Sequence, residues 1–153
     1  MAEFKTPKSL ERHLMNVIDD VIRNEVQQTI IEIWLAVQEE RVYATYEPTD
    51  YTRRGSQGGL ADPENIEFAD IQKFKNELRY VLENITKGAG DVLGEKINAL
   101  IEGKDGFAGD PYAGMPARPY TQEAIEIINS HPTAMRSALT RGFARHKLSI
   151  TVN

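Results

Sequence analysis

The sequence predicts an α+β fold, in which a long N-terminal helix and C-terminal helices pack on a small, mostly antiparallel sheet with a projecting β-ribbon. Three observations predict it: an apolar pattern at helical spacing up to Glu40, a Tyr-, Thr- and Val-rich stretch that leads into a glycine-rich turn at 55–63, and a second helical pattern after residue 119. A chain of 153 residues has the length of one domain. We therefore expect a single domain over residues 1–153.

Composition excludes several classes of protein. With 41% hydrophobic and 27% charged residues, the chain has the composition of a soluble globular protein. Its net charge of −5 creates no positive field that recruits nucleic acid or an anionic membrane. No apolar run approaches the roughly 20 residues that a membrane span needs, and the first residues lack the apolar core of a secretion signal. Cysteine is absent, so we expect an intracellular chain without disulfides, thiolate chemistry or cysteine-ligated zinc.

The N-terminal helix is the clearest element. It begins at Thr6-Pro7, because threonine can cap a helix and proline in the first turn loses no hydrogen bond. Apolar residues then recur every three or four positions: Met15, Ile18, Ile22, Val26, Ile30, Ile33 and Val37. A second stripe, Leu10, Leu14, Val17 and Val21, widens the apolar face over the first half of the helix. A helix of roughly 30 residues is about 45 Å long, more than a small sheet covers. It is either a core helix or one that also packs against a neighbouring subunit, with Trp34 as the reporter of that packing.

The ribbon spans about residues 42–66. Its first part, 41–54, has the composition of a strand, and Pro48 restricts it to a sheet edge or to two short strands. Turn residues fill positions 55–63. Tyrosine and arginine are enriched where proteins contact each other. We therefore expect the ribbon to dock other proteins through Tyr43, Tyr46, Tyr51, Arg53 and Arg54.

Residues 64–86 allow two interpretations. Ile71, Phe74 and Leu78 continue at helical spacing, whereas Leu78, Tyr80 and Leu82 alternate as in a strand. Lys75-Asn76-Glu77 can turn a hairpin between two strands. Periodicity favours a helix over 70–85, and the family resemblance described below favours two strands, which is the interpretation we choose.

The second half of the chain alternates short helices with loops. A helix is expected from about Asp91 to Glu102, followed by a long glycine- and proline-rich loop over about 103–119. A helix then begins at Thr121, is interrupted at Pro132 and resumes to about His146. The alternating tail from Leu148 to Val152 predicts a terminal strand.

No constellation of catalytic or metal-binding residues is present. The three histidines, His13, His131 and His146, have no partners at metal-ligand spacing, and Ser56 lacks the glycines of a nucleophile elbow. Gly88–Gly90 lacks the Lys-Ser/Thr of a phosphate loop, and Asp105 with Asp110 misses the calcium-loop spacing. We therefore predict no enzyme activity, no cofactor and no metal.

Basic residues gather in the last quarter of this acidic chain. They are Arg118, Arg136, Arg141, Arg145 and Lys147. They form either a solvated helix face or a surface that pairs with an acidic neighbour, which in a homo-oligomer is the chain's own N-terminal half.

The order of these motifs resembles the head–tail joining, or neck, proteins of long-tailed phages. The long helix is followed by Val-Tyr-x-x-Tyr-x-Pro-x-x-Tyr-x-Arg-Arg and Gly-Gly-Leu-x-Asp-Pro-x-Asn-Ile, then Leu-Ile-Glu-Gly at 100–103, Arg-Pro-Tyr at 118–120 and Leu-Thr-Arg-Gly-Phe near the end. The resemblance implies a structural protein that forms a ring at the head–tail junction of the virion, after assembly in the host cytoplasm. Its partners are then further copies of itself and other neck, connector and tail proteins, while DNA passes through the lumen without sequence-specific binding. The alternative functions are a monomeric adaptor or other small binding protein and, less favoured, an enzyme of unrecognised type.

Overall fold

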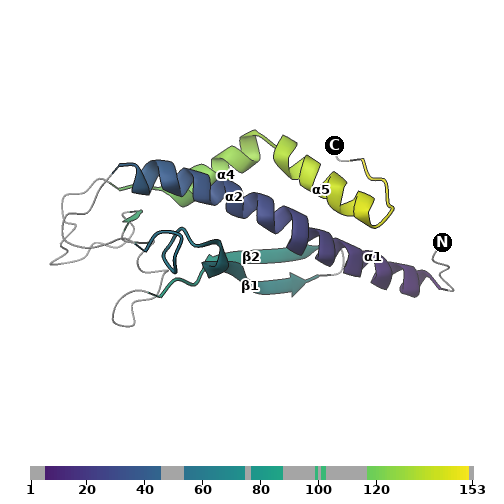
Figure 1. Cartoon of the computed structure of the whole chain (residues 1–153). Helices are drawn as coiled ribbons and strands as arrows, with labels where there is room; N and C mark the ends of the chain where they lie inside the picture. The colour runs from purple at the N-terminus through teal and green to yellow at the C-terminus, as the bar shows by residue number, and fades with distance from the viewer. Residues whose placement is uncertain are drawn as a thin grey trace. The chain divides into compact units, whose positions relative to one another are not determined.

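The chain is an α+β protein, whose described residues form a long N-terminal helix, two C-terminal helices and a two-stranded antiparallel sheet (Figure 1). This computed structural model describes residues 6–45, 54–74, 77–87, 99, 101–102 and 117–151. The predicted fold class is confirmed. Contacts divide the chain into two compact units, Met1–Ile33 with Ile125–Asn153, and Trp34–Ala124. The single-domain expectation stays a prediction.

The N-terminal helix is continuous and contains two π-helical turns. It comprises α1 (Pro7–Val21), η1 (Ile22–Val26), α2 (Gln27–Gln38) and η2 (Glu39–Tyr43). Thr6 caps it through a reciprocal pair of hydrogen bonds with Ser9, and Pro7 lies in the first turn, as predicted. The Gln27 amide donates to the Ile22 carbonyl, and the Ala44 amide donates to the Glu39 carbonyl at 2.8 Å. Both bonds span five residues, which is the signature of a π turn.

The π turns shift the helical repeat along the N-terminal helix. Each inserts one residue into the helical repeat, so an apolar stripe at three- and four-residue spacing does not continue along one face. In the first unit the buried residues are Val17, Val21 and Ile31, whereas Met15, Ile18, Ile22 and Ile30 of the predicted stripe are half-buried. Val17 and Val21 belong to the second predicted stripe and Val37 to the first, so periodicity predicted the helix and part of its buried face.

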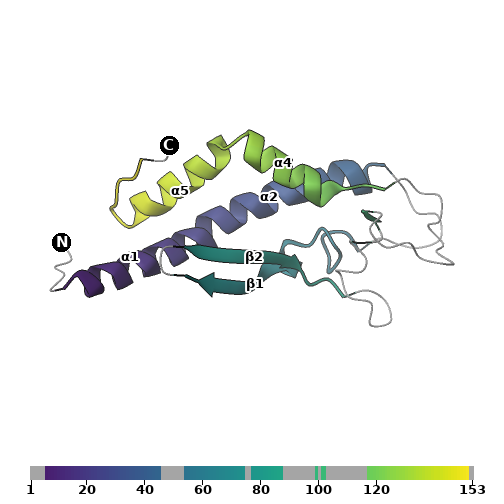
Figure 2. The ribbon, with the colours of Figure 1, turned by 180° about the vertical axis from the view of Figure 1, so that it is seen from behind.

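In the first unit, α5 (Thr133–Arg145) packs against α1 and η1 (Figures 1 and 2). Small residues permit this close approach, because Ala138 and Gly142 are both buried on α5. A Cβ atom at Gly142 would lie 2.5 Å from the Val21 Cγ1 atom. α4 (Tyr120–Ser130) ends just before Pro132, as predicted.

The C-terminal tail is not a strand over residues 148–151, which corrects the prediction. The Leu148 amide donates to the Phe143 carbonyl at 3.0 Å, and the Lys147 amide donates to the Ala144 carbonyl at 2.8 Å. Lys147 itself has a φ of 59°. These features form a Schellman motif, so the backbone after His146 closes the end of α5 instead of entering a strand.

In the second unit, β1 (Ile66–Lys73) and β2 (Leu78–Asn84) form an antiparallel hairpin. The two-strand interpretation of residues 64–86 is thus confirmed, and the helical one is wrong. The pairing aligns Ile66 with Asn84 and Lys73 with Leu78, and a bulge lies between Phe68 and Asp70. The Phe74 amide donates to the Glu77 carbonyl at 2.8 Å and closes the hairpin end.

Three predicted elements were wrong or lie outside the described residues. Val42 and Tyr43 belong to the helix rather than to a strand, and Ala44 and Thr45 form a turn. Residues 46–53, most of the predicted first arm of the ribbon, lie outside the description. Of the predicted helix near 91–102 only residues 99 and 101 are described as helical, and of the long loop only 117–119 are described.

Candidate protein-interaction surface

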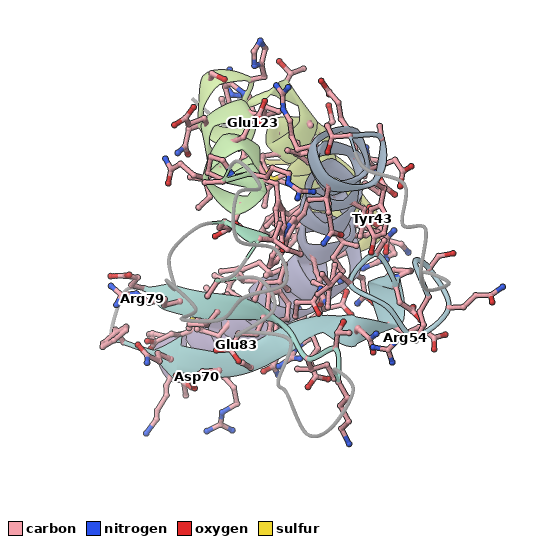
Figure 3. The ribbon with its side chains drawn as sticks, turned by 90° about the vertical axis from the view of Figure 1, so that its left-hand side faces the viewer. Tyr43, Arg54, Asp70, Arg79, Glu83 and Glu123 are labelled. Carbon is pink, nitrogen blue, oxygen red and sulfur yellow. The ribbon has the colours of Figure 1, made fainter. Side chains whose placement is uncertain are left out.

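The predicted ribbon residues fall on different elements. Tyr43 is half-buried in η2, Arg54 is exposed at the start of the turn, and Trp34 is half-buried in α2. Figure 3 shows Tyr43 at the helix end and Arg54 on the turn, with their side chains apart. Tyr46, Tyr51 and Arg53 lie outside the described residues. The structure thus does not bring the described contact residues into one patch.

Residues 54–66 form a turn that is held by its own hydrogen bonds. Gly55 and Gly58 have φ values of 50° and 75°, a region that glycine adopts without steric cost. The Asp62 carboxylate accepts from the Gly58 amide at 2.6 Å and from the Glu64 amide at 3.0 Å. It thereby caps η3 (Pro63–Asn65). Gly59 is buried, and a Cβ atom there would collide with the Gly55 backbone.

The same turn is fastened to the end of β2. The Asn84 amide donates to the Leu60 carbonyl at 2.9 Å, and the Thr86 hydroxyl donates to the Gly59 carbonyl at 3.0 Å. Asn84, Thr86 and Leu60 are all buried. The glycines therefore belong to a turn that these hydrogen bonds hold in place.

Arg54 takes part in this attachment. Its guanidinium donates to the Lys87 carbonyl at 2.6 Å, although the side chain is exposed. An arginine expected only to contact a partner thus also links the turn to the strand end.

The hairpin has one apolar and one charged face. Ile66, Phe68 and Ile71 share a face with Leu82 and Tyr80, whose ring lies 5.0 Å from that of Phe68. The other face carries exposed charges, Glu67, Asp70, Arg79 and Glu83. In Figure 3 Asp70, Arg79 and Glu83 project from the hairpin. Alternation predicted the two faces, but the charged pattern was not recognised as a possible contact surface.

Three buried polar side chains lie in the second unit: Gln38 on α2, Tyr120 on α4, and Glu102. Tyr120 and Gln38 are almost fully buried, and the Glu102 carboxylate accepts from the Thr121 amide at 2.9 Å. Burial, and then the nearby Glu102 charge, raise the pKa of Tyr120 well above its ordinary value. The Gln38 amide is close enough to lower the pKa of Tyr120 slightly, yet no hydrogen bond of normal geometry satisfies its nitrogen or oxygen. Sequence reasoning missed this group, because polar residues give no periodic signal of burial.

Arg41 and Glu123 form a two-pronged ion pair in the same unit. The Arg41 Nε atom lies 2.7 Å from Glu123 Oε2, and its Nη2 atom lies 2.5 Å from Oε1. The hydrogen bond from Arg41 lowers the pKa of Glu123, and the Glu123 carboxylate raises the pKa of Arg41. The pair orients one end of α4 relative to η2.

The basic last quarter of the chain is partly neutralised within the first unit. Arg145 contacts Asp20 at 2.7 Å and Glu25 at 3.2 Å, and Arg141 contacts Glu25 at 3.3 Å. His146 Nε2 lies 2.7 Å from Asp20 Oδ2, and this hydrogen bond is the main reason why the pKa of Asp20 is lowered. These basic residues thus pair with acidic residues in the N-terminal half of their own chain.

The described residues contain neither a metal-binding cluster nor a helix suited to span a membrane. Within 6–45, 54–74, 77–87, 99, 101–102 and 117–151, no group of three or more His, Asp or Glu side chains is arranged to hold a metal ion. In the same part of the chain, no helix combines the length and apolar character of a membrane span.

Comparison with known proteins gives one positive result. No curated protein and no solved structure matches the chain significantly. The model of the YomN family matches residues 6–141. This family is phage-derived, with YomN itself from a Bacillus prophage, which indicates a phage protein. Because the match covers most of the sequence, the chain belongs to the YomN family.

Proposed function

We propose that this chain is a structural protein of the phage neck, which forms a ring that joins the head connector to the tail and lets DNA pass. The observation that carries the proposal is the match to a phage-derived family over residues 6–141. The motifs of the resemblance to neck proteins begin at Val42, and all of their residues except Gly142 and Phe143 lie within that range.

The architecture of the second unit supports a subunit that is completed by its neighbours. A sheet of two strands is marginally stable by itself in water and needs a third strand or a covering element. In the described residues β1 and β2 form such a sheet. In the proposed ring, adjacent copies add contacts to this small sheet.

The charge of the chain suits a channel through which DNA moves. Its net charge is −5, and carboxylates do not retain passing phosphates as lysine and arginine do. The proposal accordingly includes no sequence-specific DNA contact, no membrane, no cofactor and no catalysed reaction. It locates the mature protein at the head–tail junction of the virion, after assembly in the host cytoplasm.

Contacts to neighbouring neck and tail proteins are assigned to the predicted residues Tyr43, Tyr46, Tyr51, Arg53, Arg54 and Trp34. Arginine and tyrosine at such positions contribute large contact areas and charge-assisted hydrogen bonds. Arg54 has a second role, because its bond to the Lys87 carbonyl holds the turn.

The test is inactivation of the gene in the phage that encodes it. We expect DNA-filled heads and finished tails to accumulate separately in electron micrographs, and purified chain added to the lysate to join them. Arg53→Ala is expected to join them less well while its melting temperature is unchanged, with Ser56→Ala, an exposed turn residue, as the matched control. Normal infectious particles in the absence of the chain would contradict the proposal.

A further inference from the structure

In the described part of the second unit, β2 has one edge that no described strand covers. Among the described residues the sheet consists only of β1 and β2, so β2 pairs with a described strand along one edge only. An uncovered edge is a template for another strand. β2 runs for seven residues, Leu78–Asn84, without proline, glycine or a bulge.

The edge of β1 is less suited to pairing. The bulge between Phe68 and Asp70 interrupts it, and bulges are one of the means by which proteins block an exposed edge. Its charged face carries two carboxylates, Glu67 and Asp70. Two copies joined through β1 would bring like charges together.

The charges of β2 are incompletely matched within the chain. Glu83 lies directly opposite Glu67, and like charges in cross-strand positions are destabilising. Arg79 lies opposite Gln72 and contacts Glu77 at 3.4 Å, where both side chains are about 60% exposed. An ion pair this exposed contributes little, so Arg79 can exchange it for a better partner.

We propose that β2 pairs antiparallel with β2 of a second copy, about a twofold axis through Val81. In this register Arg79 of each copy lies opposite Glu83 of the other, so two ion pairs form on the charged face. Tyr80 lies opposite Leu82 of the second copy on the apolar face, and Val81 lies opposite its own equivalent. The strand Leu-Arg-Tyr-Val-Leu-Glu-Asn is therefore complementary to itself.

Other edge pairings satisfy fewer of these groups. A shift of the β2–β2 register by two residues keeps the faces matched but separates Arg79 from Glu83. Pairing of β2 with β1 of a second copy can place Arg79 near Glu67 or Asp70, but the face of β1 that carries these residues has no cation for Glu83 among the described residues, and the pairing uses the bulged edge. The twofold register alone gives both charges of β2 an opposite partner.

This contact goes beyond the proposed ring. A twofold contact is closed, whereas a ring needs a head-to-tail contact between different surfaces. The paired β2 strands create a four-stranded sheet, which meets the minimum for independent stability. The twofold pair is thus a separate association. It either forms before the ring or links two subunits of the ring.

Charge reversal tests the register. Arg79→Glu places two Glu–Glu pairs in its own dimer, and Glu83→Arg places two Arg–Arg pairs in its own dimer. We expect each variant alone to show a self-association Kd at least about tenfold higher than wild type. An equimolar mixture restores two Glu–Arg pairs, and we expect its Kd to return to within about threefold of wild type. Sedimentation equilibrium measures the three samples, and circular dichroism checks the fold of each variant.

Engineered cysteines provide a second test, because the natural chain has none. Val81→Cys is expected to form a disulfide-linked dimer on mild oxidation, since each cysteine lies opposite its equivalent. Arg79→Cys and Glu83→Cys are each expected to remain uncrosslinked alone and to crosslink when mixed. Gln72→Cys, on the same face of β1, is the control and should not crosslink.

Several outcomes overturn the inference. They are a wild-type chain that stays monomeric at high concentration, a charge-reversed mixture that does not recover association, and a dimer in which Gln72→Cys crosslinks as readily as Val81→Cys. Head–tail joining is measured separately with the same variants. A failure of twofold pairing with normal joining contradicts this inference only, and twofold pairing by a chain that does not join heads to tails contradicts the proposed neck function only.

Discussion

At the scale of single residues, Gln38 stands out because it is a buried polar side chain without a regular hydrogen bond. Its side chain is 1% exposed, and neither amide atom makes a hydrogen bond of normal geometry, although the amide lies close enough to Tyr120 to affect its pKa. A buried polar group without a partner costs about 1–3 kcal/mol of stability. Tyr120 beside it keeps its proton at all ordinary pH values, because burial raises its pKa.

We predict that Gln38→Leu leaves the free energy of unfolding unchanged or raises it by about 1 kcal/mol. Leucine fills a similar volume and removes two unsatisfied atoms. Urea unfolding at neutral pH measures the change. Gln28→Leu is the control, since Gln28 is exposed on the same helix and surface substitutions change stability by less than about 0.5 kcal/mol. A loss of more than about 1 kcal/mol on Gln38→Leu would mean that the amide is paired in the native state.

At the scale of elements, α5 packs closely on the N-terminal helix because residue 142 is a glycine and has no Cβ atom. Gly142 lies within α5 and approaches Val21, which is fully buried. The close approach was not predictable from the sequence, where a glycine inside a helical pattern only lowers helix propensity.

We predict that Gly142→Ala destabilises the chain by about 1–3 kcal/mol, because overpacking outweighs the gain in helix propensity. Thermal unfolding measures the change in Tm. The double variant Gly142→Ala with Val21→Ala provides the matched test, because a smaller side chain at position 21 accommodates the new methyl group. The double variant should therefore be destabilised less than the sum of the two single variants, by at least about 0.5 kcal/mol. Additive effects would mean that the two residues are not in contact.

At the scale of the whole molecule, opposite charges hold distant parts of the sequence together. Asp20 and Glu25 on the N-terminal helix meet Arg141, Arg145 and His146 at the other end of the chain. The pKa of Asp20 is lowered in the folded chain, mainly by the hydrogen bond with His146. A carboxylate with a lowered folded pKa stabilises the fold above its ordinary pKa and loses that contribution as the pH falls through the folded value.

We therefore predict that wild type loses stability on acidification from about pH 5 to about pH 3, and that Asp20→Asn shows a smaller loss over the same range. At neutral pH the variant is less stable than wild type, and the two converge in acid. Melting curves at several pH values provide the measurement. Asp19→Asn is the control, because Asp19 forms its ion pair with Arg23, one turn away on the same helix. Parallel curves for wild type and Asp20→Asn would contradict the prediction.

The sequence by itself determined the elements whose causes are local. Thr6, Ser9 and Pro7 start the long helix, Pro132 separates α4 from α5, and the glycines at 55 and 58 supply the left-handed turn residues. Each of these effects depends on a few neighbouring residues and on backbone sterics. The hairpin at 66–84 was resolved only with the help of the family resemblance, because its apolar residues fit both a helical and a strand period.

Only the tertiary structure decided what those elements bury and pair with. Val42 and Tyr43 favour strands by propensity, yet the helix continues through them and buries Val42, since burial outweighs differences of under about 1 kcal/mol in propensity. The tail residue Leu148 completes the cap of α5 rather than a strand. Arg145 selects Asp20 from a distance of 125 residues, and Glu83 lies opposite Glu67. Such partners lie far apart in sequence, so they become visible only when the fold brings them together.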